Sequence, residues 1–187
     1  LPAERYVAGV LAGESSVFRN DEALKAMAVA ARTYAARSRG RHAREGFDFC
    51  DTTHCQRLDL SGINERVTKA AAATQGELLW FEGKPALSMY SRNCGGRTEA
   101  WRDLTVPYLR MQNDPYCRPA AWAWSATPRQ IILALKASGL TVPADLLDVN
   151  VLERTASGRA RTLALLGKSR SVPIAAGSFR FAIGRAL

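Results

Sequence analysis

Helical periodicity dominates the first forty residues. The segment from Leu1 to Gly13 predicts an amphipathic helix, because its apolar residues recur three and four positions apart. These residues are Tyr6, Val7, Val10 and Leu11. A second helix is predicted to begin after Asn20-Asp21, either of which can cap it, and to end near Ser38. Its expected buried stripe consists of Leu24, Met27, Ala28, Ala31, Tyr34 and Ala35.

A long polar loop at 40–62 separates these helices from a mixed region. Further helices are predicted at 65–74, at 129–137 with Pro128 in its first turn, and from Ser178 onward. Alternating patterns predict one hairpin from 77–81 with 86–90, a second from 149–154 with 161–166, and a strand at 172–175. Helices and strands are segregated, which favours an α+β fold. We expect N-terminal helices packed on antiparallel hairpins, with a smaller C-terminal β-rich lobe.

The length of 187 residues and the apolar fraction of 47% suit one domain with its own core. We therefore expect a single domain over 1–187. Its motif-bearing core is expected at 1–120, and a C-terminal helix, hairpin and closing helix at 121–187. No apolar run approaches the roughly 20 residues that span a bilayer, so no transmembrane segment is expected in this chain.

The formal charge of +9 favours polyanionic partners such as an acidic cell wall. The densest basic cluster ends the second helix and enters the loop: Arg32, Arg37, Arg39, Arg41 and Arg44. It lacks the interleaved aromatic side chains of nucleic-acid readers. Nucleic acid is therefore not an expected partner.

Glu14 is the first candidate for chemistry. It lies three, four and seven residues beyond Leu11, Val10 and Val7, so on a continued helix it emerges from the apolar face. A carboxyl group there is partly desolvated, which favours the protonated form that a general acid needs. The alternative is a helix-terminal glutamate that turns to solvent.

Both histidines of the chain and two of its four cysteines fall within 14 residues. These are His42, Cys50, His54 and Cys55. Two imidazoles and two thiolates make a closed tetrahedral zinc set, which is typical of a structural site. Asp48 and Asp51 are candidates for orienting the ligands. A Cys50–Cys55 disulfide is the alternative.

A third candidate segment, 90–99, follows the first predicted hairpin. Gly95 and Gly96 permit close approach of the backbone to a ligand or a tight reversal. Cys94 has no histidine left to serve as its base, so a disulfide with Cys117 is the simpler expectation for it. Glu99 is either a second carboxylate, a helix cap or an ion-pair partner.

Four segments occur in an order that resembles the sporulation stage II protein D family, whose domain is also found in amidase-enhancer proteins. They are YVAGVLAGE at 6–14, EALKAMAVAARTYA at 22–35, CDTTHCQ at 50–56 and CGGRTE at 94–99. The resemblance runs from Leu1 to about Cys117. A weaker similarity lies in 157–159 and 179–180.

The resemblance implies a peptidoglycan lytic transglycosylase with Glu14, Arg32 and Tyr90 as catalytic residues. Some members of the family bind zinc in the segment corresponding to 42–55, and others lack the ligands. Cys94, with Gly95, Gly96 and Thr98, is expected to bind substrate. Cys94 stands where other members carry serine.

The implied chemistry needs one carboxyl group. The acid protonates the oxygen between MurNAc and GlcNAc, and the C6 hydroxyl of the sugar attacks to give a 1,6-anhydroMurNAc end, unlike the two-carboxylate glycosidases. The expected partners are peptidoglycan glycan strands and a cell-wall amidase. The expected location is exported: the periplasm, the cell wall or the outer face of the membrane. The alternative function is a non-catalytic module that binds the wall or activates an amidase.

Overall fold

The computed structural model describes residues 1–187 except 16–17, 92, 102–105, 119–120, 122 and 187. The chain forms two compact units, Leu1–Ser91 and Arg92–Leu187. Helices predominate in the first unit and paired antiparallel strands in the second, so the predicted α+β class is confirmed. That 1–187 acts as a single domain stays a prediction.

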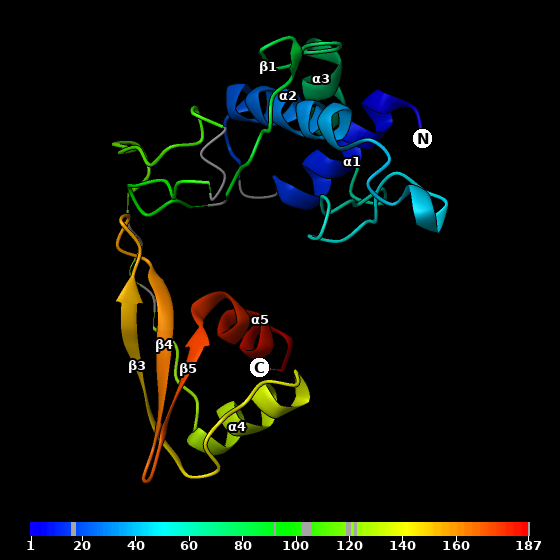
Figure 1. The fold of residues 1–187 in the computed structure, drawn as a ribbon. Helices are drawn as coiled ribbons and strands as arrows, with labels where there is room; N and C mark the ends of the chain where they lie inside the picture. The colour runs from blue at the N-terminus through cyan, green and yellow to red at the C-terminus, as the bar shows by residue number, and fades with distance from the viewer. Residues whose placement is uncertain (16–17, 92, 102–105, 119–120, 122, 187) are drawn as a thin grey trace. The chain divides into compact units, whose positions relative to one another are not determined.

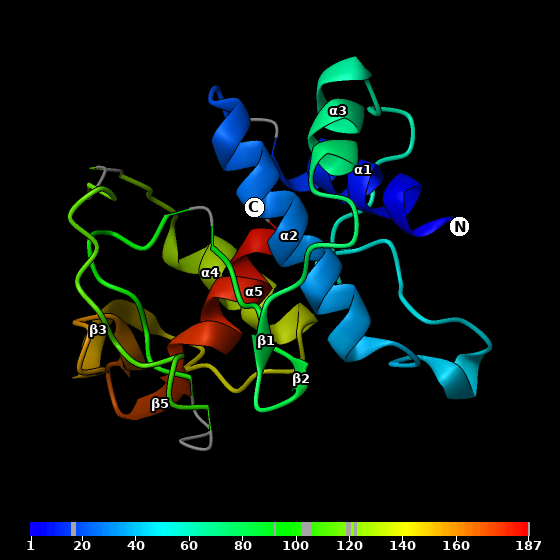
Figure 2. The ribbon, with the colours of Figure 1, turned by 90° about the horizontal axis from the view of Figure 1, so that it is seen from above.

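Three helices build the first unit: α1 (Ala3–Glu14), α2 (Asp21–Ser38) and α3 (Glu65–Ala73). They pack on one another around a single core (Figures 1 and 2). Leu11 and Leu24 lie at its centre and are almost completely buried. The Asn20 side chain caps α2 by accepting a hydrogen bond from the backbone of Glu22 at 2.8 Å. The predicted stripe of α2 is buried, apart from Ala35, which is half-buried.

The predicted first hairpin is much shorter than its sequence pattern. Strand β1 (Trp80–Phe81) pairs with β2 (Lys84–Pro85) through a turn in which Glu82 and Gly83 have φ of 48° and 71°. Beyond these strands one more backbone bond forms, from the Ala86 N–H to the Leu79 carbonyl at 2.8 Å, and the flanking residues otherwise bind α2. Leu79 donates its N–H to the Thr33 hydroxyl, and the Ser88 hydroxyl donates to a carbonyl of α2. The strands predicted at 77–81 and 86–90 were therefore wrong in length, because α2 competes for their hydrogen bonds.

The second unit is a three-stranded meander covered by two helices (Figure 1). Its sheet has the order β3 (Leu146–Arg154), β4 (Ala160–Gly167) and β5 (Ser171–Ala175), all antiparallel. Helices α4 (Pro128–Ala137) and α5 (Ala176–Ala186) pack on this sheet. Their shared core includes Leu135 and Leu165, both with no exposed surface. The sequence predicted each of these elements to within three residues at their starts.

Three local features shape the segments between the main helices and strands. Thr127 and Gln130 form a reciprocal capping box at the start of α4. Between Cys94 and Cys117, residues 96–98 run antiparallel to 112–114, and Thr98 donates its N–H to the Gln112 carbonyl at 2.8 Å. A short 3₁₀ helix, η1 (Ala43–Glu45), interrupts the polar loop of the first unit.

None of the helices formed by the described residues combines the length and apolar character needed to cross a bilayer.

Candidate functional site

Glu14 is the last residue of α1 and is half-buried. Its Oε1 accepts a hydrogen bond from the backbone N–H of Arg57 at 2.9 Å. This bond fixes the carboxyl group to the end of the long loop, 43 residues away in sequence. Because only one oxygen is used by Arg57, the other remains available to a different partner.

Two glycines on α1 allow the loop to approach. A Cβ added at Gly13 would lie 2.3 Å from the Arg57 carbonyl oxygen, which no side chain can accommodate in place. At Gly9 an added Cβ would meet Leu58 Cδ1 at 2.7 Å, and the Gly9 carbonyl accepts the N–H of Asp59 at 3.0 Å. The spacing of four residues places both glycines on one face of α1, against which residues 57–59 lie.

A chain of polar side chains extends from Glu14. The Tyr6 hydroxyl donates to Gln56 Oε1 at 2.9 Å, and Gln56 Nε2 donates to the Tyr90 hydroxyl at 3.3 Å. The Glu14 carboxylate lies close enough to the Tyr90 hydroxyl to influence its pKa. Gln56 is only 1% exposed, so its amide is held in one orientation. The structure thus brings two of the predicted catalytic residues, Glu14 and Tyr90, into one network.

Tyr90 remains protonated throughout the physiological range. Burial of the hydroxyl raises the pKa of Tyr90 to about 12, and the neighbouring Glu14 carboxylate acts in the same direction, whereas the bond from Gln56 opposes it. A neutral tyrosine can donate its proton in a hydrogen bond to a carboxylate or a sugar oxygen. Burial likewise raises the pKa of Tyr6.

Arg32 makes different contacts. Its guanidinium is buried and forms a two-pronged ion pair with Glu4, at 3.0 Å and 2.6 Å. It also donates to the Thr74 hydroxyl and to the carbonyls of Ala71 and Glu77. These contacts join α1, α2 and the end of α3, so they give Arg32 a structural role. A catalytic role for Arg32 stays a prediction.

A cavity of about 600 Å³ lies beside Arg32. Its lining includes Tyr6, Phe49, Cys50 and Leu58, so it extends along α1 and α2 to the polar loop. Glu14 and Tyr90 are not among its lining residues. The cavity therefore adjoins the Tyr6 end of the polar network.

The predicted metal ligands converge. The donor atoms of His42, Cys50, His54 and Cys55 all lie within 4.8 Å of one another. Cys55 Sγ lies 3.3 Å from His42 Nε2, and His54 Nδ1 lies 3.6 Å from Cys50 Sγ and 3.8 Å from Cys55 Sγ. Tetrahedral coordination with ordinary Zn–S and Zn–N bonds separates sulfur from nitrogen by about 3.6 Å. The four residues therefore fit a zinc ion with little movement.

The surroundings of the cluster suit a metal as well. His42 directs Nδ1 to the Glu45 carboxylate at 2.9 Å, which leaves Nε2 to face the sulfurs. The residue orienting His42 is therefore Glu45 of η1; Asp48 instead accepts the N–H of Gly40 and closes the loop. Hydrogen bonds from the hydroxyl and the N–H of Thr52 lower the pKa of Cys50 to about 5. The thiolate that a metal requires is thus the stable form of Cys50 at neutral pH.

All four cysteines are free thiols in the structure. Cys50 and Cys55 both contact the His54 ring and are not joined by a disulfide. Cys94 and Cys117 are neighbours, as the sequence analysis expected, but the S–S bond expected between them is not formed. Their sulfurs instead contact Asp114 Oδ2 and Asn93 Oδ1, each at 3.3 Å.

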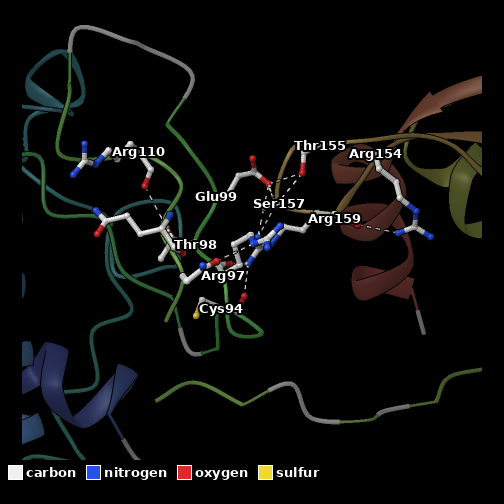
Figure 3. Close-up of polar contacts among 12 residues, drawn as sticks. Cys94, Arg97, Thr98, Glu99, Arg110, Arg154, Thr155, Ser157 and Arg159 are labelled. Atoms are coloured by element: carbon white, nitrogen blue, oxygen red, sulfur yellow. Dashed lines mark hydrogen bonds and ion pairs between the residues drawn. The ribbon is translucent and has the colours of Figure 1, made fainter. Parts of the chain in front are cut away.

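The predicted substrate-binding segment belongs to the second unit. Figure 3 shows the polar contacts of this segment. Gly95 and Gly96 both have positive φ, 66° and 87°, which explains why glycine occupies these positions. The Thr98 hydroxyl is bonded to the backbone of Arg110 and Gln112, so it holds the loop together. Glu99 accepts hydrogen bonds from Thr155 and Ser157. Substrate binding by Cys94, Gly95, Gly96 and Thr98 stays a prediction.

Sequence reasoning missed Gln56 and the backbone of Arg57. Gln56 belongs to the CDTTHCQ segment, which indicated the family, but the sequence did not show which residues the Gln56 amide would bind. The only other signal was the Gly9–Gly13 spacing, which marks the face of α1 that a backbone approaches.

The first unit is similar in sequence to the stage II sporulation protein family. The family model described as "Stage II sporulation protein" matches residues 1–81, which confirms the resemblance to this family over that segment. The match ends at Phe81, so it covers Glu14, Arg32 and all four residues of the Cys/His cluster.

Curated relatives carry the similarity further along the chain. Stage II sporulation protein D of Bacillus amyloliquefaciens is 33% identical over 135 residues, covering 62% of this chain and 39% of that protein. The protein of the same name from Bacillus subtilis strain 168 is 31% identical with the same coverage. The amidase enhancer of Bacillus subtilis strain 168 is 33% identical over 138 residues, covering 72% of this chain and 18% of that protein. The matched region is thus well under half the length of these relatives.

Proposed function

We propose that this chain is a peptidoglycan lytic transglycosylase in which Glu14 is the single acid and base. The observation that carries the proposal is the half-buried Glu14 carboxyl group, bonded to the Arg57 N–H and adjoining Tyr90. A carboxyl group fixed in this way can present one oxygen to a sugar in a constant orientation. The family match over residues 1–81 supports a role in the cell wall.

In the proposed reaction, Glu14 first gives its proton to the oxygen between MurNAc and GlcNAc as that bond breaks. The C6 hydroxyl of the MurNAc then attacks the anomeric carbon and returns a proton to the Glu14 carboxylate. The products are a 1,6-anhydroMurNAc end and a free GlcNAc hydroxyl, so protons balance without a second carboxylate. Tyr90, neutral and hydrogen-bonded, steadies the carboxylate or the sugar.

The zinc that the Cys/His cluster fits would be structural in this proposal. His42, Cys50, His54 and Cys55 would hold it, and its chemistry would be to cross-link the loop. Cys55 is followed directly by Gln56 and Arg57, the two residues that reach Tyr90 and Glu14. Ordering Cys55 therefore orders the contacts of the catalytic carboxyl group.

Replacing Glu14 by glutamine tests the mechanism. The amide of Glu14→Gln keeps an oxygen for the Arg57 N–H but has no acidic proton to donate, so cleavage should fall by about 10²–10⁴-fold. Glu65→Gln is the control, because this exposed residue pairs with Lys69 on the surface, at 2.7 Å. The assay is mass spectrometry of anhydro ends released from intact peptidoglycan and from glycan stripped of stem peptides. Full turnover by Glu14→Gln would refute the proposal.

Elemental analysis of the purified protein tests the metal. Zinc should be present, and the double variant Cys50→Ser/Cys55→Ser should lose one equivalent per chain. Protein that contains an intact Cys50–Cys55 disulfide and no zinc at this cluster would reject the site. The Glu14→Gln variant should keep its zinc, which separates the two experiments.

A second function, activation of a cell-wall amidase by a non-catalytic module, is favoured by the similarity to an amidase enhancer and by the charge of +9. The two functions differ in their dependence on Glu14. An activating module should stimulate an added amidase equally well with Glu14→Gln, and it should release no anhydro ends. Both functions place the protein outside the cytoplasmic membrane, at the wall.

A further inference from the structure

A second group of potential metal ligands lies in the other unit of the chain. The Sγ atoms of Cys94 and Cys117 and a carboxylate oxygen of Asp114 lie within 4.8 Å of one another. All three residues are half-buried. They belong to the second unit, so they are separate from the His42–Cys55 cluster in the first.

The local backbone builds this arrangement. The Asp114 N–H donates to the Gly96 carbonyl at 2.9 Å, which sets Asp114 beside the turn that follows Cys94. Asp114 Oδ1 accepts the N–H groups of Tyr116 and Cys117, at 3.0 Å and 3.2 Å. These two bonds fix the carboxylate, so Oδ2 is left to face Cys94 Sγ at 3.3 Å.

A backbone donor faces one of the sulfurs. The Cys94 N–H donates to Cys117 Sγ at 3.2 Å. The positive φ values of Gly95 and Gly96 make the tight turn here, and the Gly95 N–H donates to Asn93 Oδ1 at 2.7 Å. This N–H···S bond fixes the position of Cys117 Sγ relative to Cys94.

The turn is anchored from outside. Arg159 donates Nη2 to the Cys94 carbonyl at 2.6 Å and to the Arg97 carbonyl at 2.9 Å (Figure 3). Its Nη1 donates to Ser157 at 2.7 Å, and Ser157 is bonded to Glu99. The hairpin between β3 and β4 therefore holds the backbone of Cys94 in place.

We propose that Cys94, Asp114 and Cys117 form a second metal site, for a thiophilic divalent cation of the zinc class, with a fourth coordination position open to water or another ligand. Three protein donors with one open position is a known zinc arrangement. Ordinary Zn–S and Zn–O bonds in a tetrahedron would separate sulfur from oxygen by about 3.6 Å, close to the 3.3 Å between Cys94 Sγ and Asp114 Oδ2. A disulfide would use the two sulfurs and leave Asp114 without a role in the site.

The test counts metal ions per chain. The 187-residue chain, reduced and stripped of metal, is titrated with Zn²⁺, and with Co²⁺ as a visible probe of thiolate ligands. Cys94→Ser/Cys117→Ser should lose one equivalent relative to the wild type and should keep the equivalent held by the His42–Cys55 cluster. Cys50→Ser/Cys55→Ser should show the opposite loss. Because the two losses are counted separately, failure of one site leaves the result for the other intact.

Asp114→Asn is the decisive variant, because it separates a metal site from a disulfide. Its Oδ1 can keep both backbone bonds, so the loop should fold, but its amide nitrogen is a poor ligand. We expect the second site to bind about tenfold more weakly or worse, since even losing a group that merely orients a ligand costs this much. Oxidation to a Cys94–Cys117 disulfide should be unchanged. Equal metal affinity in Asp114→Asn and the wild type overturns the proposal, and so does a Cys94→Ser/Cys117→Ser variant that binds as much metal as the wild type.

Discussion

The close contact between α1 and the loop makes Gly13→Ala a sharp perturbation of the Glu14 environment. The added Cβ would stand 2.3 Å from the Arg57 carbonyl oxygen, whereas ordinary contact begins near 3.4 Å. Because the obstacle is backbone, the whole residue must move by about 1 Å. Its N–H is the donor to Glu14 Oε1, so this displacement acts directly on the proposed catalytic group.

The cost in stability and the cost in rate should differ. Overpacking of this kind destabilises by about 1–3 kcal/mol. Replacing glycine by alanine inside a helix stabilises the folded protein by about 1 kcal/mol, which offsets part of this loss. The net loss of stability is therefore about 0–2 kcal/mol, which leaves the protein folded. A displacement of about 1 Å at a catalytic group can nevertheless lower the rate by about 10²-fold.

Gly9→Ala is the matched control on the same helix. Its Cβ would meet the end of the Leu58 side chain, which can change rotamer, so the backbone near Glu14 need not move. Thermal unfolding and release of anhydro ends should be measured for both variants. Near-normal activity of Gly13→Ala, or an equal loss in Gly9→Ala, would show that the Arg57–Glu14 bond does not position the acid.

Two further predictions concern the neighbours of Glu14. Arg32→Lys should lower the free energy of unfolding by about 2–4 kcal/mol, because lysine cannot keep both the two-pronged ion pair with Glu4 and the bonds to the end of α3. Glu4→Gln should lower the free energy of unfolding by a smaller amount, because Glu4 is partly exposed. If activity below the melting temperature is lost in Arg32→Lys but kept in Glu4→Gln, Arg32 has a catalytic role beyond the structural one. Tyr90→Phe removes the hydroxyl that accepts a neutral hydrogen bond from Gln56 beside Glu14, worth about 0.5–1.5 kcal/mol, and should slow cleavage by about 2–10-fold. The Tyr90 pKa is raised from 10.0 to about 12 in the folded protein, so the stabilisation from neutral Tyr90 is complete below pH 10 and lost as the pH rises through 12. The pH–rate profiles of Tyr90→Phe and the wild type should therefore have the same shape below pH 10. A fall in the wild-type rate between pH 7 and pH 10 that is absent from Tyr90→Phe would contradict the raised pKa of Tyr90.

Local signals were sufficient for most of the fold. The helices were predicted because apolar spacing and caps such as Asn20 and Thr127 lie within a few residues of each other. The first hairpin was predicted too long because its strand pattern gave no sign that Thr33 on α2 accepts the N–H of Leu79. That bond joins residues 46 positions apart, and tertiary competition of this kind is absent from a local pattern.

In the candidate site, too, features set by neighbouring residues could be predicted, and contacts between distant residues could not. The Cys/His cluster was predicted because rare residue types gathered in a short stretch, and the structure brings all four donors together. The residue orienting His42 was predicted among Asp48 and Asp51, yet it is Glu45, because the one-turn helix η1 places residues three apart on the same side. The Arg57 contact with Glu14 could not be predicted, since a backbone N–H is common to nearly every residue type.

Three consecutive residues of the polar loop join the proposed zinc site to the proposed catalytic acid. Cys55 is a ligand in the proposed zinc site, Gln56 binds Tyr6 and Tyr90, and Arg57 binds Glu14. An extended chain advances only about 3.3–3.6 Å per residue, and Arg57 is two residues from Cys55. Loss of order at Cys55 would therefore also displace the Arg57 N–H that binds Glu14. Four protein ligands would fill a tetrahedral zinc site, whereas Glu14, the proposed acid, is oriented by its bond to the loop at Arg57. The loop therefore explains how a structural ion could control a reaction that needs only one carboxyl group.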